Sequence, residues 1–376
     1  MGPEQERSTV LNRETGTFKK TYQDDLAIYK APLPKITVGV ICLLVFVIVP
    51  LLGSEYWLGI LNLIGIASLG ALGLNILIGY TGQISVGHAA FMSVGAYSAA
   101  VILREFPDAH WIIALVGGGC AAAIAGMLFG IPSLRIKGLY LAVATLAAQL
   151  IIEWIINHWE WLSGGAQGSI YIVPPTFPWF ENGEFVAKKM VENVHYYYLI
   201  YVVLFIGVLA ALNIFRSYLG RAFIAVRDRD IAAEIIGINI FKTKLIAFGI
   251  ASFYAGVTGV LYTYFYSIAN YEMFTLVISI QFLAMCIIGG LASILGSILG
   301  AAFITLLPIV LDLVIRGLGG SVLGWDDAHA SRILPQWNLM FFGGLIMFFL
   351  VVEPDGLARL WRKFTDYFRV WPFPYN

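Results

Sequence analysis

The stretch Leu58–Phe91 reads LGILNLIGIASLGALGLNILIGYTGQISVGHAAF and contains the pattern that decides the fold. Its first part, Leu58–Tyr80, carries no charged residue and supplies the roughly 20 apolar residues that a helix needs to cross a bilayer. A Gly-rich break follows at Ile78–Gln83, and a second apolar run of small residues continues from Gly87. Because lipid offers backbone polar groups no water to bond, both runs are expected to be membrane helices.

The composition extends this prediction to the whole chain. Of the 376 residues, 59% are hydrophobic and 12% are charged, whereas soluble domains carry about 25% charged residues. The formal net charge is zero, which offers no basis for nucleic-acid binding. The predicted fold class is an all-α, polytopic transmembrane bundle of about ten spans, with a range of about eight to ten. The apolar runs are Ile36–Tyr56, Leu58–Tyr80, Ile84–Leu103, Trp111–Ile131, Leu139–Ile156, Tyr197–Ile214, Leu245–Tyr266, Phe274–Ile288, Ile294–Ile315 and Leu339–Val352.

The basic residues predict the orientation of these spans. If the N-terminus is cytoplasmic, every Lys and Arg falls on the cytoplasmic side except Arg104, Lys188, Lys189, Arg316 and Arg332. This bias is what the positive-inside rule expects of a multi-pass protein of the bacterial inner membrane.

The same count assigns the segments between the spans. Residues 1–35 are expected to form a cytoplasmic tail and residues 36–352 the transmembrane domain. Within that domain, 157–196 is predicted to be periplasmic and 216–244 cytoplasmic. Residues 353–376 are predicted to be a cytoplasmic, amphipathic and basic tail that lies on the lipid surface.

A weak internal repeat relates two parts of the chain. Ile78–Gln83 leads to Gly87–Phe91, and Ile288–Ser293 leads in the same way to Gly300–Phe303. Paired Gly-interrupted membrane segments are typical of a transporter's midplane site. Chance recurrence of Gly and Ala in tightly packed helices explains the pattern equally well. The candidate residues of a translocation pathway are Asn75, Gln83, Ser85, Gly87, His88 and Gln281.

Few ionisable residues lie within the predicted spans, among them His88, Glu153 and Asp312. His88 has two possible interpretations. It is either a neutral ring that is hydrogen-bonded to a neighbouring helix or a residue close to the translocation pathway. Glu153 is interpreted as an interfacial carboxylate, and Asp312 as the partner of Arg316 in an i,i+4 ion pair. Secondary transporters and pumps need buried carboxylates to bind coupling ions. The driving force is therefore expected to come from other chains.

The motifs of catalysis are missing from the sequence. It contains no G-x-x-x-x-G-K-[ST] phosphate loop, no nucleophile elbow and no His or Cys at metal-ligand spacing. We therefore expect no catalytic, metal-binding or cofactor-binding residue on this chain, and ATP hydrolysis is not expected of it.

The segment Val226–Ile238 in the cytoplasmic loop predicts a short amphipathic helix with acidic residues at its start and Gly near its end. Its apolar side is expected to combine Ile231 and Ile235 with small alanines that permit close docking. A solvated surface helix is the alternative. The candidate docking residues are Arg227, Asp228, Asp230, Ile231, Ala232, Ala233, Glu234 and Gly237.

Several spaced motifs together resemble the branched-chain amino acid ABC importer permeases, in particular the LivM-type subunit. The motifs are Gly73–Phe91 with Gly95–Tyr97, Gly220–Ala222 through Ala232–Ala233, Gly237–Asn239, Lys244–Phe248, Gly289–Leu291 and Pro354–Leu357. The resemblance implies a heteromeric importer with a LivH-like sister permease, two cytoplasmic subunits that bind ATP and Mg²⁺, and a periplasmic solute-binding protein. It also implies that Asp228–Gly237 is the coupling helix that contacts an ATPase.

The sequence departs from that family in its outer loop. Gln167 stands where Asn or Asp is usual, Ser169 replaces Leu, and the loop is rich in aromatic residues. Branched-chain or other hydrophobic amino acids remain the first expectation for the solute, with urea, amides and aromatic acids as alternatives. A self-sufficient secondary transporter or channel is the alternative function.

Overall fold

A computed structural model describes residues 39–40, 42–106, 110–133, 139–163, 169–172, 176–181, 184–189, 192–322, 327–352 and 356–370. The chain divides at Leu58 into two compact units. The predicted tail 1–35 lies outside the described residues, as do residues 353–355 and 371–376.

The described part of the first unit is built from short helical pieces. A π-helical turn, η1 (Leu44–Ile48), leads into α4 (Val49–Leu52), which has Pro50 in its first turn. Residues 42–52 are all helical, so α4 continues directly from η1. Gly53 has extended backbone, with ψ 130°, and ends α4. The run predicted as one span at Ile36–Tyr56 is therefore interrupted, which a hydropathy pattern does not reveal.

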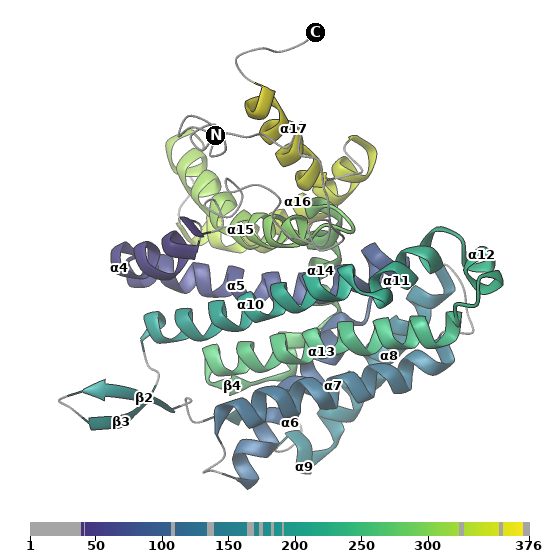
Figure 1. The fold of residues 1–376 in the computed structure, drawn as a ribbon. Coiled ribbons are helices and arrows are strands. Elements are labelled where there is room, and N and C mark those ends of the chain that lie inside the picture. The colour runs from purple at the N-terminus through teal and green to yellow at the C-terminus, as the bar shows by residue number, and fades with distance from the viewer. Residues whose placement is uncertain are drawn as a thin grey trace, which may run out of the picture. The chain divides into compact units, whose positions relative to one another are not determined.

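The second unit is a bundle of long helices, of which α5, α10, α13 and α7 run side by side (Figure 1). Its elements are α5 (Glu55–Asn75, which begins in the first unit), η2 (Ile76–Tyr80), α6 (His88–Glu105), α7 (Trp111–Ser133), α8 (Leu139–His158), α9 (Glu160–Ser163), α10 (Asn193–Arg216), α11 (Tyr218–Asp228), α12 (Asp230–Ile235), α13 (Ile240–Tyr266), η3 (Tyr271–Phe274), α14 (Leu276–Gly289), α15 (Ile294–Val322), α16 (Asp327–Val352) and α17 (Gly356–Val370).

Seven helices in the described part of the chain are long and apolar enough to cross a membrane, against the ten spans predicted. The predicted third span begins as helix only at His88, in α6, and the predicted tenth is the last part of α16. The seven are Glu55–Tyr80, Trp111–Ile131, Tyr140–His158, Asn193–Arg216, Ile240–Tyr266, Tyr271–Gly289 and Ile294–Ile315.

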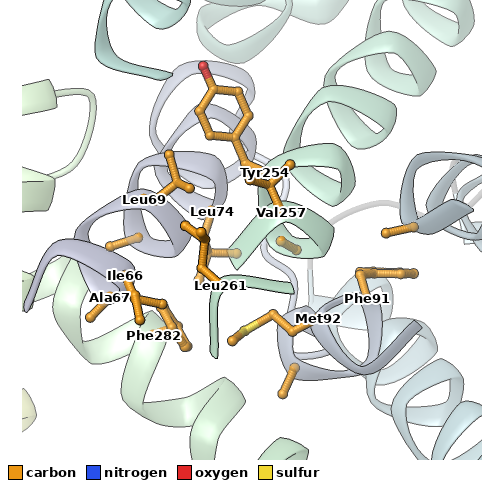
Figure 2. Packing of buried hydrophobic residues seen from close by; sticks show 14 of the residues in the cluster. Ile66, Ala67, Leu69, Leu74, Phe91, Met92, Tyr254, Val257, Leu261 and Phe282 are labelled. Carbon is orange, nitrogen blue, oxygen red and sulfur yellow. The ribbon is translucent and has the colours of Figure 1, made fainter. Parts of the chain in front are cut away.

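The core forms where α13 packs against α6 and α7. A Cβ on Gly95 of α6 would collide with the backbone of Gly256 in α13, so these two helices approach each other to backbone contact. Figure 2 shows Met92 of α6 beside Leu261 of α13, with Phe282 of α14 close by. Small residues allow this approach because lipid supplies no hydrophobic force between helices and van der Waals packing must replace it. The small-residue run after Gly87 is thus a packing face.

The fold is all-α, as predicted, and two small antiparallel sheets accompany its helices. Strand β2 (Thr176–Glu181) pairs with β3 (Glu184–Lys189) as a hairpin inside the loop predicted to be periplasmic. Strand β1 (Ile170–Tyr171) of the same loop pairs with β4 (Ile268–Ala269), which connects α13 to η3. These strands were not predicted from the sequence.

Segments predicted to lie on one side of the membrane contact one another. At one end, Asn62 Nδ2 donates to the Asn193 carbonyl at 3.0 Å, and Arg104 Nη1 donates to the Trp161 carbonyl at 3.0 Å. At the other end, Arg227 Nη1 donates to the Gly79 carbonyl at 2.9 Å. The alternation of ends along the chain agrees with the predicted order of inner and outer segments, without assigning which end faces the cytoplasm.

Candidate docking and translocation sites

The loop predicted to be cytoplasmic contains two helices rather than one. The first, α11, starts at Ser217, whose Oγ accepts a hydrogen bond from Leu219 N at 3.2 Å. Its inner face is buried through Gly220, Ala222, Phe223 and Val226. The sequence reading missed α11 because its charged residues make the loop look hydrophilic, although its apolar residues recur at helical spacing.

The second helix, α12, has well-defined ends. Arg229 is extended, with φ −153°, and separates it from α11. At the other end Gly237 has φ +90°, Gly237 N donates to the Glu234 carbonyl, and Ile238 N donates to the Ala233 carbonyl, both at 3.0 Å. This pair of bonds is the Schellman arrangement, which favours glycine at the left-handed position. The glycine signal at the C-terminal end is confirmed, whereas the N-cap residue is Arg229, which makes no side-chain cap hydrogen bond.

The exposed side of α12 contains the isoleucines that were predicted to form a docking face, but it lacks one of the two alanines. Ile231, Ile235 and the neighbouring Ile236 are 69%, 81% and 73% exposed. Ala232 is also exposed, but Ala233 is only 2% exposed and belongs to the inner face of the helix. The alanine pair therefore does not form a single docking face, because consecutive helical residues point about 100° apart.

A groove of about 450 Å³ lies next to α12. Its lining combines the end of α12 with the first turn of α13, and Asn239 caps that turn through Oδ1, which accepts from Lys242 N at 2.9 Å. Two charged residues, Glu234 and Lys244, are part of its lining. The lining residues are Glu234, Gly237, Ile238, Asn239, Ile240, Phe241 and Lys244.

The charged residues around the α11–α12 junction point in different directions. Arg227 donates through Nη1 to the Gly79 carbonyl and through Nε to Asp228 Oδ1, each at 2.9 Å. Its guanidinium therefore faces the bundle. Asp230 Oδ1 accepts from Ile231 N at 2.9 Å and so stabilises the start of α12.

The two Gly-rich motifs of the sequence form two interruptions of the bundle. The first break, Ile78–Gly87, joins η2 to α6, and the second break, Ile288–Ser293, joins α14 to α15. The structure brings the breaks together, since a Cβ on Gly79 would collide with Ala292 N. The proximity of two motifs so far apart in sequence was not predicted.

Asn75, a predicted pathway residue, bonds the end of α5 to the second break. Its Oδ1 accepts from Ala292 N at 2.9 Å. Its Nδ2 lies 3.0 Å from the Ser293 carbonyl, 2.7 Å from Ser297 Oγ and 3.4 Å from the Gly290 carbonyl. With 1% of its surface exposed, Asn75 connects helices within this chain, and its place near a translocation pathway stays a prediction.

The other pathway candidates near the first break are buried as well. Gln83 Nε2 donates to Thr81 Oγ1 at 2.9 Å, and the Gln83 and Ser85 side chains are 2% and 1% exposed. His88 stacks at a tilt against Phe282, with ring centroids 5.3 Å apart. Among the described residues, Gln83 Oε1 and His88 Nε2 are buried without a hydrogen-bond partner. Such atoms are rare in native structures and mark the polar part of the core.

The start of α6 is completed by side chains of other helices, which the sequence did not predict. Ala90 N donates to Gln149 Oε1 of α8 at 2.7 Å, and Ala89 N donates to Ser279 Oγ of α14 at 2.8 Å. Gln149 Nε2 also donates to the Phe274 carbonyl at 2.8 Å. The signal in the sequence was Gln149, which lies within the predicted fifth span. A buried side-chain amide needs hydrogen-bond partners, so Gln149 could have been expected to bond to another part of the chain.

Gly87 lies at the start of α6 beside this network, and the other predicted residues are on α8, α14 and α15. Gly87 is buried, and a Cβ there would stand 2.5 Å from the Thr145 carbonyl of α8. Gln281 on α14 is half-buried, and so is Glu153 on α8. Asp312 has an interaction partner, but the Arg316 side chain lies outside the described set, so their ion pair stays a prediction.

Long apolar helices, Gly-mediated packing and buried hydrogen bonds between spans define a multi-pass membrane protein. The family model described as the branched-chain amino acid transport system, permease component, matches residues 56–350. The chain belongs to this permease family, as its motifs indicate.

Curated relatives agree with this assignment. The chain is 29% identical over 306 residues to the high-affinity branched-chain amino acid transport system permease protein LivM of Escherichia coli (strain K12), covering 77% of this chain and 67% of the relative. It is 24% identical over 307 residues to the permease protein LivH of the same strain, covering 76% and 89%. The autoinducer 2 import system permease protein LsrC of Enterobacter sp. (strain 638) is 25% identical over 285 residues, covering 74% and 71%. No solved structure matches the chain.

Proposed function

We propose that this chain is one membrane-spanning half of an ATP-driven importer. It pairs with a LivH-like sister permease, and two cytoplasmic subunits hydrolyse ATP with Mg²⁺. A periplasmic binding protein delivers a small polar or amphiphilic solute, with branched-chain or other hydrophobic amino acids first among the candidates. Similarity to both LivM and LivH supports a pair of related permeases, and the LivM name supports the solute class.

The observation that carries the proposal is the exposed isoleucine surface of α12. Ile231, Ile235 and Ile236 are all more than two-thirds exposed, and the C-terminal end of their helix is capped at Gly237. Charged residues, among them Asp230 and Glu234, stand next to them in the sequence. Burying one such side chain is worth roughly 1.5–3 kcal/mol. The exposed apolar surface of α12 is therefore proposed to be the surface that a partner ATPase binds.

The test is Ile235→Arg in the reconstituted complex. Arg adds charge and bulk at the docking surface, and a misfit at a packed interface costs about 1–3 kcal/mol. We expect ATPase recovery in a pull-down with the permease to fall about tenfold or more. The buried Ala233 is a poorer site, because Ala233→Arg would also disrupt α12 itself.

Tyr218→Arg is the matched control, because Tyr218 is 64% exposed at the opposite end of α11. It should leave ATPase recovery at the wild-type level. If wild-type permease recovers no ATPase, or if Ile235→Arg recovers as much as wild type, the importer proposal fails. A secondary transporter or channel would then be the better interpretation.

The orientation follows from the same proposal. The loop 216–244 and residues 353–376 face the cytoplasm with the 1–35 tail, and 157–196 faces the periplasm. The supporting observations are the bias of basic residues and the meeting of predicted inner segments at one end. Single cysteines at Ser217 and Ser163 can be tested with an impermeant thiol reagent in spheroplasts. Labelling at Ser217 and not at Ser163 would overturn the orientation.

The helix α17 is proposed to lie on the cytoplasmic lipid surface. Leu360, Trp361, Phe364 and Tyr367 are 45–59% exposed and recur at helical spacing. Basic residues flank them, as in interfacial amphipathic helices. A fluorophore on Phe364→Cys in proteoliposomes should be quenched by quenchers placed in the lipid chains. Quenching by aqueous iodide alone would contradict this placement.

A further inference from the structure

The shape of the second break depends on the Asn75 side chain. Ala292 has φ +57°, in the left-handed region that residues with a Cβ rarely adopt. The N–H of this same residue donates to Asn75 Oδ1. An uncommon backbone conformation persists only where its surroundings hold it. Asn75 is therefore one of the groups that define how α14 connects to α15.

Gly79 links this contact to the loop of α11 and α12. It lies one turn beyond Asn75, and a Cβ there would collide with both Asn75 Oδ1 and Ala292 N. On its other side, its carbonyl accepts the hydrogen bond from Arg227 Nη1 at 2.9 Å. Arg227 is in the last turn of α11, two residues before the extended Arg229 that begins the connection to α12. One glycine thus touches both the docking loop and the second break.

The segment that carries Gly79 is suited to change its shape. η2 (Ile76–Tyr80) is π-helical, and π turns inside α-helices are rare and occur frequently at functional sites. Two residues beyond its end is Gly82, which has φ +66° and lies against Arg227. Conversion of a π turn to an α turn shifts the residues beyond it by about one position along the helix. An element with two discrete arrangements is what mechanical coupling between sites requires.

We propose that Arg227, Gly79 and Asn75 form a relay that transmits movement of the docking loop to the second break. Displacement of α11 pulls on the Gly79 carbonyl and shifts η2. The shift moves Asn75, which carries the backbone of Ala292 and Ser293 with it and changes the junction of α14 and α15. Asn75 is a positioning residue in this relay. The inference rests on the proposed function, since an ATPase is the source of the movement.

The test measures coupling in the complete complex reconstituted in proteoliposomes, with leucine as the solute. Three variants are compared with wild type: Asn75→Ala, Arg227→Gln and the double variant. The readout is the amount of solute imported for each ATP hydrolysed. We expect each single variant to lower this ratio about tenfold, because each interrupts the same relay. The double variant should then have the same solute-to-ATP ratio as the single variants, since either change alone already interrupts the relay.

Two results would overturn the relay. One is an unchanged ratio in Asn75→Ala or Arg227→Gln. The other is a double variant whose loss is the product of the two single losses, because that shows independent effects. A merely structural role for Asn75 lowers the amount of functional complex but leaves solute per ATP unchanged, so the ratio separates the two roles.

A milder variant keeps the test decisive if Asn75→Ala does not fold. Ser297→Ala removes only the acceptor 2.7 Å from Asn75 Nδ2 and leaves the Ala292 bond intact. It should lower the ratio by about threefold, and an unchanged ratio would count against the relay. Failure of the importer proposal itself is distinguished by the pull-down. In that case the wild-type permease, with Asn75 unchanged, would recover no ATPase.

Discussion

The two breaks of the bundle share a plan but differ in what holds them. In the aligned motifs Ile78–Gln83 and Ile288–Ser293, the fifth residue is left-handed in both, with φ +66° at Gly82 and φ +57° at Ala292. Helix precedes and follows each break. The motifs differ at their third residue, because Gly290 has φ +112° whereas its counterpart Tyr80 belongs to the π-helical η2, so the breaks share a left-handed residue at one position rather than a whole conformation.

The difference between the breaks lies in how the next helix starts. After the first break, the amides of Ala89 and Ala90 are bonded by Ser279 of α14 and Gln149 of α8. After the second break, α15 is capped by its own Ser293, whose Oγ accepts from Gly296 N at 3.1 Å. The first break is therefore locked by distant helices, whereas the second has a local cap and receives its outside support from Asn75 and from Gly356, which packs on Gly290.

The largest expected effect on uptake comes from placing a large side chain at Gly87, where the first break packs against α8. A Cβ at Gly87 would stand 2.5 Å from the Thr145 carbonyl, so Gly87→Leu forces α6 and α8 apart. We expect uptake to be abolished while membrane insertion persists, because Leu favours insertion. Ala90→Leu should behave alike, since Ala90 is 1% exposed. The measurement is radiolabelled solute uptake with membrane levels checked by immunoblot.

Gly344→Leu on α16 is the control, because nothing in the described structure lies within 4 Å of a Cβ there. It should retain uptake close to wild type. Substantial uptake in both Gly87→Leu and Ala90→Leu would show that contact between α6 and α8 at the first break is dispensable.

The sequence predicts the helices well and their interactions poorly. Long uncharged runs such as Leu58–Tyr80 become helix because lipid leaves the backbone no alternative. The cap of α12 at Gly237 was likewise predictable, since its bonds are local. The contact of Asn75 with Ala292 was not, because residues more than 200 positions apart meet only through the tertiary fold. Periodicity also could not show that Ala233 faces inward, since that depends on what α12 packs against.

An intermediate effect should distinguish the two kinds of helix start. Gln149→Met replaces an amide that accepts a hydrogen bond from Ala90 N and donates one to the Phe274 carbonyl. Each buried group left unpaired costs roughly 1–3 kcal/mol of stability. Ser293→Ala removes one local cap, worth about 1 kcal/mol. We expect Gln149→Met to destabilise the protein at least twice as much. Thermal unfolding in detergent micelles measures both, and equal losses would show that α6 does not depend on its distant partners.

The smallest effect tests the left-handed residues that the breaks have in common. Gly82→Ala places a Cβ in the left-handed region, which costs roughly 1–2 kcal/mol for residues other than glycine. The new Cβ would also stand 3.1 Å from Arg227 Cγ. Ala292→Gly does the opposite: it relieves strain of about the same size, but the more flexible unfolded chain offsets about 0.4–1 kcal/mol of that gain. We therefore expect Gly82→Ala to lower the thermal unfolding midpoint, and Ala292→Gly to leave it near or slightly above wild type. A large loss in Ala292→Gly would mean that the alanine methyl group is itself needed for packing, and that the two breaks differ at the one position where their backbones agree.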